Sequence, residues 1–236
     1  MITRRAEEFA ESELKRRLAP RHGLSVWWVV LWTPLLWLAS AWLTVALWRF
    51  PKDFVAGAPA YAFACAFALG GILFCFFPMR PLYVFGHELT HWLAAVLTMH
   101  KTGALRLGLR KGSVEIPRPT LFIALAPYFI PLYLLLSAGL FTFAGLYCPV
   151  EPVAFWTVAF AWIGLCYSYH IVLTVLALAH GQSDLQYRGP VLSCAVIVLG
   201  NLLVLYLVMA MISQNWRAAW EVPWQILLEL KPSPPR

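Results

Sequence analysis

Residues 85–97 read Phe-Gly-His-Glu-Leu-Thr-His-Trp-Leu-Ala-Ala-Val-Leu, an apolar stretch that contains two histidines and one glutamate. Four residues of an α-helix advance the chain by about one turn, so His87 and His91 lie on one face and can contact the same ion. Glu88 projects beside that face. A His-Glu-x-x-His sequence on a helix is typical of zinc sites in which the glutamate acts as a general base.

The surroundings of this motif favour metal binding. The neighbouring side chains are almost all apolar, and an ionisable group inside an apolar helix is costly unless it has a partner. Zinc would bring the pKa of a bound water close to neutrality, and Glu88 would take the proton. The alternative is a chance match in which the two histidines form a hydrogen-bonded polar pair inside a helix bundle.

The composition predicts an integral, multi-pass membrane protein. Of 236 residues, 61% are hydrophobic and 12% are charged, and the mean hydropathy is +0.70, whereas a soluble domain is about a quarter charged. Crossing a bilayer takes about 20 apolar residues. Six runs qualify as candidate spans: 26–48, 54–78, 82–99, 119–147, 152–179 and 190–213. We therefore expect an all-α bundle of about six transmembrane helices, in a membrane of the bacterial inner (cytoplasmic) type.

The charges divide the chain into three parts. Residues 1–25 form a charged surface segment with a short mixed-charge helix at 4–17, residues 26–213 form the membrane domain, and residues 214–236 form a tail. Trp216, Trp220 and Trp224 recur every fourth residue in this tail, which predicts a helix at the membrane interface, interrupted by Pro223. The net charge of +7 comes from residues that flank the apolar runs. This placement indicates a lipid bilayer as partner and no nucleic acid.

Two histidines leave zinc one protein ligand short. The remaining candidates are the few polar residues in or beside the apolar runs: His100, Glu115, Glu151, His170, His180 and Asp184. The five cysteines have no paired spacing, so we interpret them as small core residues.

Asp184 lies in a polar interruption, His-Gly-Gln-Ser-Asp-Leu, at residues 180–185. Over about residues 80–190 the chain resembles the site-2 protease family of intramembrane zinc metalloproteases, in which a later helix supplies an aspartate. The resemblance implies that His87, His91 and Asp184 bind Zn²⁺ and that Glu88 is the catalytic base. The family's usual glycine after the aspartate is replaced by Leu185. Asp184 could instead cap the next helix, and His180 is the rival third ligand.

Two further features lie close to the motif in the sequence. Residues 104–116 alternate apolar side chains about a glycine, which predicts a β-hairpin. In the resembled family a β-element binds substrate as an added strand; a surface hairpin with no such role is the alternative. Pro127 and Pro131 interrupt the next apolar run and predict a kink or break beside the site. Asn201 is predicted to form an interhelical hydrogen bond.

The six-span topology conflicts with the charges. Five Lys and Arg residues place the hairpin region on the cytoplasmic side, but six full spans then put the N-terminal segment outside, although it carries six Lys or Arg. Either the N-terminal charges do not determine the orientation of the chain, or one of the early apolar runs does not cross the membrane. With each of the later runs crossing once, Asp184 meets the histidines only if it dips into the membrane or the motif helix tilts.

The leading hypothesis from the sequence is a membrane zinc endopeptidase that cuts a peptide bond in or near a transmembrane segment of a partner protein. Its residues would be His87, His91 and Asp184 as metal ligands and Glu88 as the base. One rival is a non-catalytic membrane protein that uses the histidine pair for structural metal binding or transport. A second rival is a membrane hydrolase that acts on a lipidated peptide or another substrate that does not span the membrane.

Overall fold

The computed structural model describes residues 26–51, 57–109, 112–147, 152–180, 183–186, 189–213 and 215–229. Residues 1–25, with the helix expected at 4–17, and Glu151 lie outside this part of the chain. The described elements are α2 (Val26–Arg49), α3 (Ala58–Phe76), α4 (Arg80–Leu97), β1 (Leu105–Arg106), β2 (Ser113–Val114), α5 (Leu121–Phe129), α6 (Leu132–Tyr147), α7 (Pro152–Ala179), α8 (Ser183–Gln186), α9 (Pro190–Ser213) and α10 (Trp216–Glu229).

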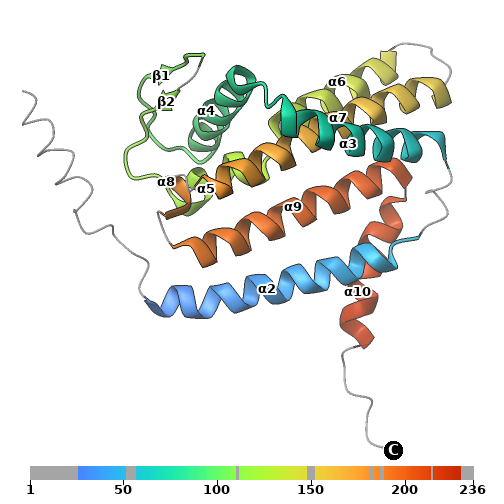
Figure 1. Ribbon diagram of the computed structural model, residues 1–236. Coiled ribbons are helices and arrows are strands. Elements are labelled where there is room, and N and C mark those ends of the chain that lie inside the picture. Colours follow the sequence, from blue (N-terminus) through green and yellow to red (C-terminus); the bar gives the residue numbers. More distant parts are fainter. Residues whose placement is uncertain are drawn as a thin grey trace, which may run out of the picture.

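The long helices form a bundle with two distinct ends. Helix α3 packs along α7, α2 packs along α9, and α5 lies between α4 and α9. In Figure 1, the two strands, α4, α8 and the first turns of α2 and α9 gather at one end, while α10 and the last turns of α2, α6 and α9 lie at the other. The motif helix α4 and the segment around Asp184 therefore share one end of the bundle.

Among the described residues, four helices are long and apolar enough to cross a membrane: Val29–Arg49, Ala58–Phe76, Val153–Ala179 and Pro190–Ser213. Helices α5 and α6 add a fifth crossing if the bent pair counts as one span. Only 11% to 44% of each of the four windows is buried inside the bundle, so apolar side chains face outward, as lipid requires. The chain is thus consistent with a membrane protein.

The expected count of six spans is not confirmed, because α4 is not among these helices. Its 18 residues carry Arg80 and the three polar motif residues on a largely apolar sequence, and these lower its hydropathy. Its buried side is the face with His87, Thr90 and His91, and its last turn exposes Val96 and Leu97. A helix built in this way buries a polar stripe against its neighbours.

The predicted break at the prolines is confirmed. Helix α5 ends at Phe129, α6 begins at Leu132, and the two axes are bent by 66°. Pro127 lies inside α5, and Thr120 caps that helix by accepting a hydrogen bond from the Ile123 amide at 3.2 Å. The bend turns α5 toward α4, so that a short buried helix faces the motif.

The predicted hairpin is also present, as a two-stranded antiparallel sheet in which Leu105 pairs with Val114 and Arg106 with Ser113. It packs against α4. A Cβ on Gly112 would lie 2.6 Å from Cγ of Glu88 and 2.9 Å from a methyl of Val84. Glycine is thus required here because β2 begins in contact with the glutamate of the motif.

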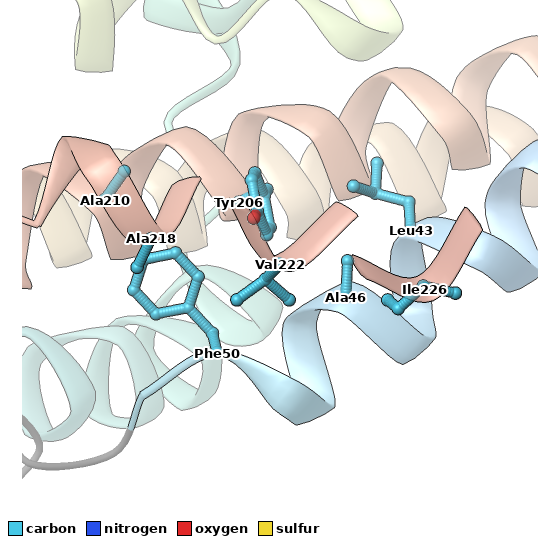
Figure 2. Close-up of a cluster of buried hydrophobic side chains, with 8 residues drawn as sticks. All are labelled: Leu43, Ala46, Phe50, Tyr206, Ala210, Ala218, Val222 and Ile226. Atoms are coloured by element: carbon cyan, nitrogen blue, oxygen red, sulfur yellow. The ribbon is translucent and has the colours of Figure 1, made fainter. Parts of the chain in front are cut away.

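Helix α10 covers the opposite end of the bundle. Figure 2 shows its inner face packed on α2 and α9, in the cluster Leu43, Ala46, Phe50, Tyr206, Ala210, Ala218, Val222 and Ile226. Its three tryptophans are exposed, as expected for an interfacial helix. The expected interruption at Pro223 is wrong, because the helix continues through it. Proline frees the carbonyl four residues earlier, and Ala219 accepts a hydrogen bond there from the Tyr206 hydroxyl at 3.1 Å.

Candidate metal centre

Three side chains from two distant segments meet beside α5, two of them in hydrogen bonds to Ile123 and Tyr128 of that helix. The Nε2 atoms of His87 and His91 lie 3.2 Å apart, and Oδ2 of Asp184 lies 3.5 Å from each of them. His87 and His91 are buried on α4, while Asp184 is half-buried in α8. These residues form a group that could hold a metal ion.

Two of the three sides of the triangle of ligand atoms have the length that tetrahedral zinc demands. Zinc bonds to nitrogen and oxygen are about 2.0–2.2 Å long, so two ligands at the tetrahedral angle lie roughly 3.3–3.6 Å apart. Both Asp184 distances, 3.5 Å, fall within this interval, and they exceed the usual N–H···O separation of about 2.7–3.2 Å. The carboxylate is equidistant from both imidazoles, and the two Nε2 atoms, 3.2 Å apart, are slightly closer to each other than the tetrahedral interval.

The electrostatics of Asp184 suit a ligand. Burial alone would raise the pKa of its carboxyl group, but the interactions with His87 and His91 outweigh burial and hold that pKa well below its usual range. The carboxylate therefore stays ionised at neutral pH. A metal ligand has to be deprotonated, so no proton has to leave Asp184 when an ion binds.

The His91 ring is oriented by a backbone carbonyl that Pro127 leaves without its usual helical donor. Its Nδ1 donates to the backbone carbonyl of Ile123, at 2.8 Å. In an uninterrupted helix that carbonyl would accept from the amide of residue 127, but Pro127 has none. The freed carbonyl instead fixes the ring so that Nε2 points to the metal group, the arrangement common in metal-bound histidines.

Tyr128 orients Asp184. Its hydroxyl donates to Oδ2 of Asp184 at 3.0 Å, and its ring packs edge-on against His87, with centroids 5.3 Å apart. Its backbone carbonyl, near the end of α5, accepts hydrogen bonds from Asn201 at 2.9 Å and from Thr174 at 3.3 Å. Asn201 thus forms the interhelical bond that was predicted. Helices α7 and α9 therefore fix the position of Tyr128, and Tyr128 in turn fixes the Asp184 carboxylate.

Glu88 borders a cavity with a volume of about 1030 Å³. The three possible ligands line the same cavity, together with Ser113 and Val114 of β2. The Val114 backbone lies within hydrogen-bonding reach of the Glu88 carboxylate. The glutamate is half-buried. The arrangement places a carboxylate, a group that could bind a metal and a short strand around one space that is large enough for a peptide segment.

The structure separates the other candidates from the group of three. His180 is exposed at the end of α7; its Nδ1 contacts the Leu176 carbonyl at 2.6 Å, and the residue only lines the cavity. His100 contacts Thr98, and Glu115 lies 3.6 Å from Arg106. His170 lies in α7 and is not among the three residues whose ligand atoms lie within 4.8 Å of one another. Asp184 does not serve as the cap of α9, which begins at Pro190.

Sequence reasoning missed the roles of Ile123 and Tyr128. A signal for the first was present, since a proline four residues after a helical position leaves a free carbonyl there. The tyrosine offered no comparable signal. No family model matches the chain, and no match was found to a curated protein or to a solved structure. The functional argument therefore rests on the residues of the site.

Proposed function

We propose that this protein is a membrane-embedded zinc metalloprotease that hydrolyses a peptide bond in or near a transmembrane segment of a partner protein. The observation that carries the proposal is the triangle of His87, His91 and Asp184, with sides of 3.2 and 3.5 Å, beside Glu88 in one cavity. Two histidines and a carboxylate match the donor sets of hydrolytic zinc sites, in which three protein ligands leave a fourth position open, and this match supports the proposal.

Each residue has a distinct task in this mechanism. His87, His91 and Asp184 would hold zinc, which supplies a Lewis acid when bound and brings the pKa of water near neutrality. Glu88 would take a proton from the attacking water and later return it to the leaving amine. Val114 and Glu88 lie within hydrogen-bonding reach, so the hairpin would fix the carboxylate that carries the proton.

The cavity walls favour an extended, apolar peptide. Besides the polar motif they include Val84, Ile116, Ile123, Leu173 and Leu176. A helix resists hydrolysis until it is unwound, and the open edge of a strand offers backbone partners to an extended segment. The resemblance to the site-2 protease family supports the same role for β2, which borders the cavity.

The charge distribution supports a cytoplasmic location for the site. Of the 18 Lys and Arg residues, six precede α2 in the sequence, six lie between α3 and α5, and Arg188 precedes α9, whereas the other five lie at the end of α2 or follow α2 or α9. The first turns of α2 and α9 lie at the site end of the bundle, and their last turns lie at the other end (Figure 1). Positive residues accumulate on the cytoplasmic side. With α4 not counted as a crossing, five spans put the N-terminal segment and the hairpin on the same side, and the conflict in the sequence disappears.

Chemical labelling of single cysteines tests this orientation. In a cysteine-free variant, Ser113→Cys should react with an impermeant maleimide only from the cytoplasmic side, and Arg217→Cys only from the opposite side. Both positions are exposed. Labelling of both cysteines from one side would refute the five-span arrangement.

The Glu88→Gln variant tests the catalytic proposal even while the substrate is unidentified. Membranes from cells that produce the wild type and the variant are compared by mass spectrometry of new protein N-termini. We expect cleavage products only with the wild type, while both proteins bind zinc equally, because the substitution removes the base and keeps the ligands. Equal products from both would exclude Glu88 as the base. The Glu115→Gln variant, altered on the exposed hairpin, is the matched control and should cleave normally.

A further inference from the structure

A second, smaller cavity lies behind the metal group. Its volume is about 40 Å³, and it is lined by His87 of α4 and His170 of α7, together with residues at the bend between α5 and α6. One water molecule needs about 10–15 Å³ of such volume. This cavity is therefore large enough to hold water, and it is separate from the large cavity that contains Glu88.

Among the described residues, two histidines that line this cavity each have one ring nitrogen without a hydrogen-bond partner. Nδ1 of His87 and Nε2 of His170 are both buried, and neither makes a hydrogen bond to any described residue. Buried polar atoms without partners are rare, because each costs about 1–3 kcal/mol. Four hydroxyls that line the same cavity already donate to backbone carbonyls: those of Thr90, Tyr133, Tyr169 and Thr174. The two ring nitrogens differ in this respect from these four hydroxyls.

The two nitrogens have complementary roles if His87 binds a metal. A metal on Nε2 of His87 forces the hydrogen onto Nδ1, which becomes a donor. The Asn201 side chain and the Tyr128 backbone both lie within hydrogen-bonding reach of the His170 ring. When Nδ1 donates to one of these two groups, Nε2 is left as an acceptor. A water molecule in the cavity can accept from His87 and donate to His170.

We propose that His170 is a positioning residue for the metal centre and acts on His87 through water bound in this cavity. His91 obtains the equivalent support directly, from the Ile123 carbonyl at 2.8 Å. In this proposal the His91 ring is oriented by a backbone carbonyl, whereas the His87 ring is oriented by a water molecule that is hydrogen-bonded to His170 of α7. The inference rests on the proposed metal site and adds a residue to it.

Zinc affinity in detergent, measured by competition with a chromophoric chelator, tests this role. We expect His170→Phe to lower the affinity roughly 10- to 100-fold, the usual effect of removing an outer-shell partner. The His170→Gln variant keeps an oxygen that can accept a hydrogen bond and should stay within about threefold of the wild type. Ser168→Ala is the matched control, because it removes another buried polar atom of α7 that does not line this cavity, and it should not change the affinity.

Three results would overturn the proposal: unchanged affinity in His170→Phe, an equal loss in His170→Gln, or an equal loss in Ser168→Ala. If the phenylalanine variant does not fold, a crystal structure of the zinc-loaded wild type decides. Ordered water within hydrogen-bonding distance of both nitrogens supports the proposal, and a dry cavity overturns it. Wild-type protein that binds no zinc would refute the metal site itself, which distinguishes the two failures.

Discussion

The Tyr128→Phe substitution probes the metal centre through a single atom. It deletes the hydroxyl that donates to Oδ2 of Asp184 at 3.0 Å and keeps the ring that packs on His87 at 5.3 Å. A hydrogen bond to a charged group contributes about 1.5–3 kcal/mol. The Asp184 side chain is 30% exposed, so water can partly replace the hydroxyl and the lower value applies. Since about 1.4 kcal/mol is tenfold in affinity, zinc should bind roughly tenfold more weakly.

The measurement is a chelator competition on purified protein, with Tyr133→Phe as the matched control. That hydroxyl donates to the Leu82 carbonyl at 2.6 Å and does not contact the three ligands. The control should bind zinc with wild-type affinity. Wild-type affinity in Tyr128→Phe, or an equal loss in both variants, would refute the reasoning that Asp184 is a ligand held by Tyr128.

Three further substitutions test the surroundings of the site. Gly112→Ala should reduce peptide cleavage at least tenfold and leave zinc affinity unchanged, because its Cβ would lie 2.6 Å from Cγ of Glu88; normal cleavage would show that the hairpin does not fix the base. Gly164→Ala should lower the free energy of unfolding by about 1–3 kcal/mol, because its Cβ would overlap a backbone carbonyl of α3; Gly139→Ala, with no atom within 4 Å of its Cβ, is the control in denaturant melts. Pro127→Ala restores an amide that can donate to the Ile123 carbonyl in competition with His91. The substitution should therefore weaken zinc binding severalfold in the chelator assay, and unchanged binding would contradict this role for the proline.

The sequence predicted the parts of the site that depend on local spacing. The four-residue interval places two imidazoles on one face of α4, and this holds in any helix. The polar interruption near residue 184 stood out because apolar helices surround it. The prolines predicted the break between α5 and α6, since missing amide hydrogens act locally.

The sequence could not supply what depends on packing between distant helices. The choice between Asp184 and His180 is decided by α7, which extends to Ala179 and leaves the His180 ring against its own last turn. The hydroxyl of Tyr128 reaches Asp184 across 56 positions of the chain. The motif helix resembled a span because its apolar residues are frequent, but its polar face packs against α5 and the hairpin.

Metal analysis of the purified, metal-replete protein is the most direct test of the central claim. We predict one zinc ion per chain in the wild type and in Glu88→Gln, and substantially less in Asp184→Ala measured in parallel. A wild-type protein without bound metal, or an Asp184→Ala variant that retains a full equivalent at wild-type affinity, would contradict the claim that these three side chains form a zinc site.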